Sequence, residues 1–136
     1  MIRTKFSYSL LFFLFVYSIT YFSQSPFIVV LGTTQDAGSP QLGCNKECCF
    51  NLFKNPNSSR KVVSLGIVDP KDSKFWMIES TPDFITQSKI LKEMSGFSHT
   101  ELPDGIFITH AHIGHYTGLM YLGRESVSSK KIPVYT

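Results

Sequence analysis

GIFITHAHIGHYTGL, running from Gly105 to Leu119, is the part of the chain from which the rest is best interpreted. It places three of the four histidines directly after an apolar run typical of a short buried strand. Alternate residues of an extended segment project to one side, so His110 and His112 can reach the same point. His115 lies where a helical pattern begins, over residues 116–124, and can return toward that point. Because imidazole is the commonest protein ligand for transition metals, the segment predicts half of a metal site.

A histidine in a loop is more often an exposed or hydrogen-bonded residue than a metal ligand. We expect that ordinary state for His99, which shares no periodicity with the other three. Three imidazoles behind one apolar strand favour a metal or catalytic role instead.

The segment also resembles the H-x-H-x-D-H motif of the metallo-β-lactamase-fold hydrolases, with Gly114 where that family has aspartate. The longer run ITHAHIGHYTGLMYLGRE, with the upstream LGTTQDAGSPQLGC, looks closest to the branch that holds pyrroloquinoline quinone biosynthesis protein B. That branch also holds phosphodiesterases and tRNA-processing nucleases. The resemblance covers about residues 27–136. It implies the N-terminal half of a four-layer αββα sandwich, so we expect residues 26–136 to be a truncated part of such a domain.

In that family, the residues matching His110 and His112 bind one metal with a later histidine. The residue matching His115 helps the motif aspartate to bind a second metal. The resemblance thus implies zinc, or alternatively iron or manganese, at His110, His112 and His115. Gly114 supplies no ligand and the family's remaining ligands would lie beyond Thr136. We therefore expect an incomplete active site and assign no catalytic residue.

The resemblance places a second group of residues, Asp36 and Gly38, in a glycine-rich loop at the mouth of the metal cleft. An ordinary turn-rich loop that caps a strand is the alternative. The segment from Glu79 to Asp83 resembles the position where the family often has an aspartate that shapes the metal site from behind the ligands. For Asp83 we prefer a simpler role, capping or charging the first turn of a helix.

Cys44, Cys48 and Cys49 form a second cluster in a loop spanning residues 33–57. The resembling branch has C-x-C-x-x-C here and binds a structural zinc, whereas this chain has C-x-x-x-C-C. Three thiolates in a flexible loop can hold zinc, and we favour that role. The alternative is a disulfide between Cys44 and one of the other two, as suits an exported protein.

The N-terminal 25 residues have the pattern of a secretory signal peptide: Arg3 and Lys5, then an apolar run, then small residues. A membrane anchor is the alternative, although the run is short for a spanning helix. We expect a periplasmic or secreted protein that touches a membrane only through this segment, if it is uncleaved. Removing the two cations lowers the net charge from +3 to +1, since +3 − 2 = +1. That charge gives no case for nucleic-acid binding.

The remaining pattern predicts an α/β fold with a mixed sheet. We expect strands over residues 27–31, 62–68, 75–79, 105–108 and 132–135, the first covered on both faces. Residues 69–73 form a hairpin turn, and a helix begins near Pro82 and ends at Gly96.

Two functions remain open from the sequence. The first is a metal-dependent hydrolase-like enzyme acting on a small molecule. The second is a non-catalytic protein that binds or carries a quinone or another small molecule, with a degenerate metal site.

Overall fold

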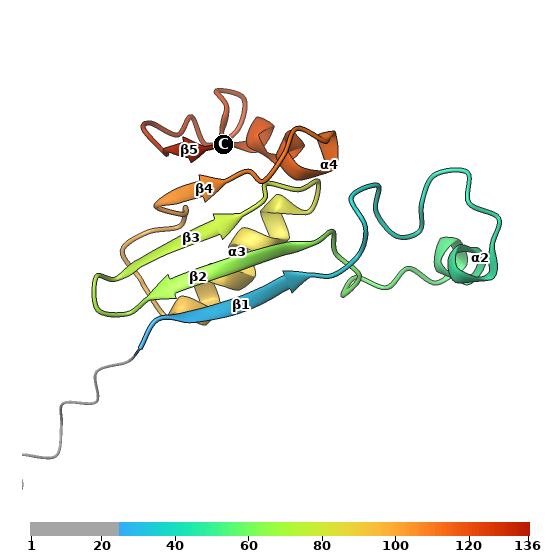
Figure 1. Ribbon diagram of the computed structural model, residues 1–136, viewed down its shortest axis with the longest axis horizontal. Helices are drawn as coiled ribbons and strands as arrows, with labels where there is room; N and C mark the ends of the chain where they lie inside the picture. The colour runs from blue at the N-terminus through green and yellow to red at the C-terminus, as the bar shows by residue number, and fades with distance from the viewer. Residues whose placement is uncertain (1–24) are drawn as a thin grey trace, which may run out of the picture.

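A mixed five-stranded sheet forms the body of the protein. The computed structural model describes residues 25–136, so the predicted signal peptide lies outside the described residues except for Ser25. The strands follow one another across the sheet in chain order (Figure 1): β1 (Phe27–Gly32), β2 (Ser64–Asp69), β3 (Lys74–Ile78), β4 (Gly105–Phe107) and β5 (Val134–Tyr135). The first three strands are antiparallel, and β3, β4 and β5 are parallel. The predicted α/β class and mixed sheet are confirmed.

Helix α3 (Phe84–Ser95) covers one face of this sheet. Leu91 is fully buried against Gly66 of β2, where an added Cβ would overlap the leucine side chain. The helix ends where the sequence predicts, because Gly96 takes the left-handed conformation with φ of 72°. The core residues, listed in chain order, are Val29, Leu31, Val68, Phe75, Met77, Phe84, Leu91 and Ile106.

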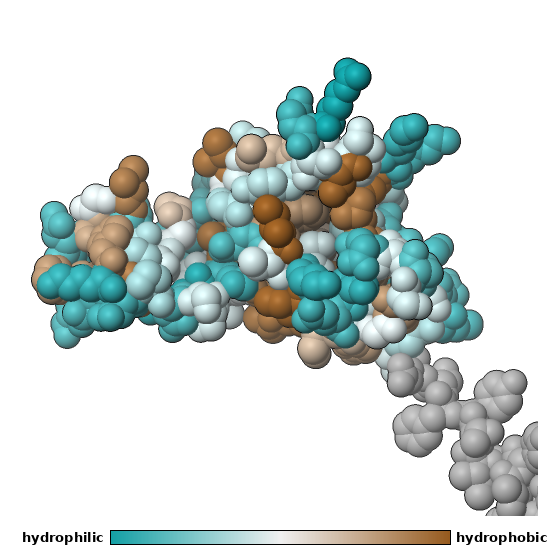
Figure 2. Space-filling view, turned by 180° about the vertical axis from the view of Figure 1, so that it is seen from behind, coloured by the Kyte–Doolittle hydropathy of each residue, from teal (hydrophilic) through white to brown (hydrophobic). Residues whose placement is uncertain are grey.

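The other face of the sheet is apolar but open. Strand register places these side chains on it: Ile28, Val30, Leu65, Ile67, Trp76, Ile78, Phe107 and Tyr135. Ile28 is 67% exposed and Val30 is 64% exposed. The expectation that the first strand is covered on both faces is therefore wrong for the described residues. Figure 1 views this face, with α3 behind the sheet, whereas Figure 2 views the side of α3.

The cysteine-rich segment projects from the body as an arm (Figures 1 and 2). It is not only a loop, as the sequence suggested, because it contains helix α2 (Glu47–Lys54). Among residues 25–136, α2 packs against no other helix or strand. Within this same part of the chain, no helix is long and apolar enough to cross a membrane.

Candidate metal centre

The three clustered histidines lie where β4 gives way to two short helical segments, α4 (Ile113–Tyr116) and η1 (Thr117–Leu122). The predicted helix over 116–124 is corrected, since α4 begins earlier and η1 is a 3-10 helix. His112 is the N-cap residue of α4, and its carbonyl accepts a hydrogen bond from the His115 N–H at 2.9 Å. The turn thus brings His115 back toward the two preceding histidines, as the sequence predicts.

His110 and His112 face one another. Their Nε2 and Nδ1 atoms are 3.0 Å apart, and the Thr109 hydroxyl lies 2.9 Å from the other nitrogen of His110. The His115 ring lies 4.1 Å from the His110 ring, centroid to centroid. The side chain of His112 is 72% exposed, whereas that of His115 is 10% exposed. The cluster therefore has one buried imidazole and two that solvent can reach.

His115 lies between two carboxylates. Its Nε2 is 3.9 Å from Asp36 Oδ2, and its Nδ1 is 3.2 Å from Glu79 Oε2. The second contact has ion-pair distance but not hydrogen-bond alignment, and both atoms are buried without a hydrogen-bond partner. Glu79 therefore lies where an outer carboxylate would orient a metal-binding imidazole by contacting the ring nitrogen that does not bind the metal.

Glu79 is held in an unusual backbone conformation. It follows β3, its side chain is 5% exposed, and its φ of 74° is in the left-handed region. Such a conformation costs about 1–3 kcal/mol in a non-glycine residue, and it concentrates at functional sites. The Glu79 N–H donates to the Phe107 carbonyl at 2.8 Å, and Oε1 accepts from the Thr109 N–H at 3.2 Å. The sequence placed only the segment 79–83 near the metal, through resemblance, and did not single out Glu79, because nothing local predicts this conformation.

The turn after β3 fixes α4 and η1 in place. The Ser80 N–H donates to the His115 carbonyl, and the Gly118 N–H donates to the Ser80 carbonyl, each at 2.8 Å. An added Cβ at Gly118 would lie 2.6 Å from Phe84 Cβ and closer still to the Thr81 carbonyl oxygen. The backbone that carries His115 therefore sits directly on the strand end that carries Glu79.

Asp36 lies closer to the histidines than the mouth of a cleft would imply. Its Oδ2 atom is 3.7 Å from His112 Nδ1 as well as 3.9 Å from His115 Nε2. Gly38, at φ of 86°, closes the same turn and lines the adjacent cleft. His99 is exposed and lies outside the cluster, as expected.

Asp83 has a different role from the predicted one. It is the N-cap residue of α3, but its side chain makes no capping hydrogen bond. Its Oδ2 instead accepts from the Val62 N–H at 2.8 Å. The buried Gln87 donates to the Val62 carbonyl at 2.7 Å. These bonds satisfy the backbone just before β2, which explains why the carboxylate points away from the helix.

The chain resembles curated proteins over part of their length. No family model matches it. It is 26% identical over 103 residues to "Coenzyme PQQ synthesis protein B" of Xanthomonas axonopodis pv. citri, with 73% of this chain and 34% of that protein covered. The values for the protein of the same name from Xanthomonas oryzae pv. oryzae are the same. The chain thus spans about a third of the length of these relatives.

Two solved structures share its arrangement. A diphosphatase of the PhnP family has a TM-score of 0.55 and 25% identity, with 82% of this chain and 41% of that chain covered. Zn²⁺-bound PqqB from Methylobacterium extorquens has a TM-score of 0.55 and 24% identity, with 71% and 36% covered. Both are metallo-β-lactamase-fold proteins. This chain has the arrangement of part of the metallo-β-lactamase fold, about two-fifths of these neighbours.

In this metallo-β-lactamase fold, the donor atoms around the histidines suit zinc. Two ligands of a tetrahedral zinc lie about 3.3 Å apart when each is about 2.0–2.1 Å from the metal. The His110–His112 separation of 3.0 Å is slightly shorter, and the two distances to Asp36 Oδ2 are slightly longer. A site of imidazoles and one carboxylate is also the chemistry that zinc prefers.

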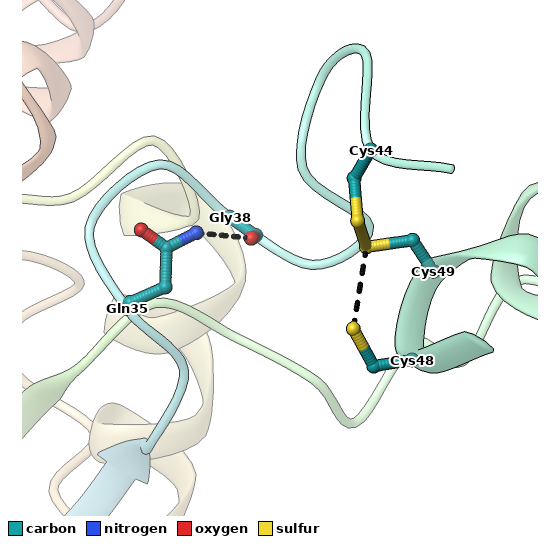
Figure 3. Close-up of a disulfide and its surroundings, with 5 residues drawn as sticks. All are labelled: Gln35, Gly38, Cys44, Cys48 and Cys49. Atoms are coloured by element: carbon teal, nitrogen blue, oxygen red, sulfur yellow. Dashed lines mark hydrogen bonds between the residues drawn. A yellow bond between two sulfur atoms is a disulfide. The ribbon is translucent and has the colours of Figure 1, made fainter. Parts of the chain in front are cut away.

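The cysteine arm holds the second group of metal-binding side chains. Cys44 and Cys49 are joined by a disulfide, the pairing that the sequence left as the alternative (Figure 3). The free Cys48 lies with its Sγ 3.9 Å from that of Cys49. All three sulfur atoms lie within 4.8 Å of one another. The arm is thus compatible with zinc when its cysteines are reduced, and zinc binding here stays a prediction.

Two hollows adjoin these clusters. The larger hollow, about 1010 Å³, is lined mainly by residues of the cysteine arm, including all three cysteines, and by Thr33. The smaller, about 340 Å³, is lined by Asp36 and Gly114. Arg60 lines both hollows. We take the smaller as the candidate substrate cleft because it is lined by Asp36, whose carboxylate faces His112 and His115.

Proposed function

We propose that the chain is the metal-binding part of a metal-dependent hydrolase that acts on a small molecule, with zinc as the metal. The observation that carries this proposal is the mutual approach of His110 and His112 at 3.0 Å, with His115 directly beside them. The zinc-bound PqqB neighbour supports the choice of metal. Iron and manganese are the alternatives that the fold family allows.

Bound zinc would supply a water molecule with a pKa near 7 for attack on a substrate. The protein's own residues would hold the site in place. Thr109 fixes the His110 ring by its contact with Nδ1, which leaves Nε2 free to face the metal. Glu79 lies against Nδ1 of His115, so that Nε2 of this ring faces the cluster. The exposure of His112 leaves the site open toward a substrate.

A metal titration tests this proposal. The purified 136-residue chain, with its thiols alkylated to keep the cysteine arm from contributing, should bind about one zinc or cobalt ion. His112→Ala should lose that ion, because it removes a ligand atom, while His99→Ala should keep it. Metal content measured by atomic emission after dialysis gives the answer. Equal content in wild type and His112→Ala would remove the histidine cluster from consideration.

A phosphate ester is the substrate class that the cleft favours. Arg60 lines the cleft beside Asp36 and Gly114, where a guanidinium can pair with a phosphate group. The similarity to a PhnP-family diphosphatase agrees with this choice. Hydrolysis of bis(p-nitrophenyl) phosphate by the zinc-loaded protein provides the assay, with inorganic phosphate as the inhibitor. Arg60→Gln should weaken this inhibition by phosphate without changing the zinc content. Zinc binding without any hydrolysis would favour the alternative, a protein that binds or carries a small molecule such as a quinone.

A further inference from the structure

Gly114 supplies no carboxylate at the position where the resembling motif has aspartate. We propose that Asp36, from the loop after β1, is a direct ligand of the metal that the histidine cluster binds. This inference rests on the proposed metal site and adds to it the anionic ligand that position 114 does not provide. Three separate observations support it: the position of the carboxylate, the contact between Asp36 and Gly114, and the bracing of the turn.

The Asp36 carboxylate faces the two histidines that follow the strand end. Oδ2 lies 3.7 Å from His112 Nδ1 and 3.9 Å from His115 Nε2, so one oxygen serves both rings. The side chain is 37% exposed, which leaves it less hydrated than a free surface carboxylate. Neither distance is short enough for a hydrogen bond. A carboxylate oxygen placed between two imidazole nitrogens is instead the arrangement expected when all three atoms bind one cation.

Gly114 is the reason that Asp36 can come so close. A Cβ at position 114 would lie 2.7 Å from Asp36 Cβ and would overlap the Asp36 carbonyl oxygen. Any side chain at this position, including aspartate, would displace the loop that holds Asp36. The glycine and the relocated carboxylate therefore depend on one another. Gly114 does not mark a degenerate site, because its small size admits a ligand from another segment.

The turn that carries Asp36 is closed by Gln35. The Gln35 carbonyl accepts from the Gly38 N–H at 3.0 Å, and the Gln35 amide accepts from the Ala37 N–H at 2.9 Å and donates to the Gly38 carbonyl at 2.7 Å. The preceding residues are anchored as well, because the Thr33 and Thr34 N–H groups both donate to the Lys61 carbonyl. These bonds hold the backbone that carries Asp36 in position before any metal arrives, which lowers the entropic cost of binding.

Zinc affinity at the histidine site tests this inference. Zinc is titrated into the thiol-alkylated 136-residue chain in competition with a chromophoric chelator. Asp36→Asn keeps the side-chain size but replaces a carboxylate by a poor ligand, so the zinc dissociation constant should rise by at least about 10-fold, the lower end of the loss seen even for outer partners. Asp72→Asn, on the exposed turn between β2 and β3, is the charge-matched control and should bind as wild type.

Gly114→Ala provides a second variant that leaves the carboxylate itself unchanged. It should also weaken zinc binding, by displacing Asp36, while circular dichroism confirms that the fold is kept. Wild-type zinc affinity in Asp36→Asn, together with its loss in His112→Ala, would overturn the role of Asp36 and leave the proposed metal site intact. Binding that is unaffected by both substitutions would show that the proposed metal site itself is wrong.

Discussion

The histidine cluster and the cysteine arm each gather three metal-binding side chains within six residues, but they differ in what stands behind them. The histidines follow a sheet strand and rest on buried groups, with His115 and Glu79 almost fully enclosed. The cysteines lie on an arm whose helix packs on no other element among residues 25–136. The histidine cluster is therefore held by tertiary structure, and the cysteine cluster is held by its own disulfide. Close spacing of ligands in the sequence does not distinguish these two situations.

A pair of glycine substitutions, one in each region, should give the largest difference in the free energy of unfolding. Gly118→Ala should lower the free energy of unfolding by about 1–3 kcal/mol, because its Cβ would force η1 away from the turn after β3. Gly43→Ala, on the arm, meets nothing within 4 Å but has φ of 73°. Its strain of about 1–2 kcal/mol should stay within the arm. Urea unfolding followed by Trp76 fluorescence would report both variants, and equal midpoints would show that the histidine scaffold is no more tightly packed than the arm.

Removing one carboxylate from each region should change zinc affinity at the histidine site in only one of the two variants. Glu79→Gln should weaken zinc binding at the histidine site by about 10–100-fold, because the amide orients His115 less well than a carboxylate does. Glu47→Gln, in the first turn of α2, removes the same charge from the arm and should leave that affinity unchanged. Competition with a chelator, using thiol-alkylated protein, provides the measurement. If Glu79→Gln bound zinc as wild type does, the contact with His115 would be structural only.

The smallest effect is expected from the disulfide. The double substitution Cys44→Ser with Cys49→Ser should shift the free energy of global unfolding by less than about 0.5 kcal/mol, the range typical of surface changes. The cross-link closes a short loop in a segment that adds no packing to the sheet or to α3. A loss of about 2 kcal/mol or more, typical of a disulfide that supports a domain, would show instead that the arm stabilises the body.

Much of the fold could be predicted from local sequence. The β2–β3 hairpin, helix α3 and its stop at Gly96 all follow from hydrophobic spacing and turn residues. The sequence does not predict helix α2, because its cysteines and the glycines and asparagines around it are typical of a loop. The helix after His112 was placed too late, since a turn of four residues carries too little periodicity to locate. The carboxylate of Asp83 was misassigned because the pattern could not show that the Val62 N–H lies nearby.

The sequence by itself determined that His110 and His112 would converge. Residues two apart in an extended segment project to the same side, and this local relation needs no tertiary contact. Only the tertiary structure decided which groups would join them. Glu79 reaches His115 because parallel pairing aligns the ends of β3 and β4. Asp36 reaches the same cluster because Gly114 leaves room for its loop. Contacts of this kind depend on the packing of segments far apart in the chain, and spacing along the sequence carries no record of them.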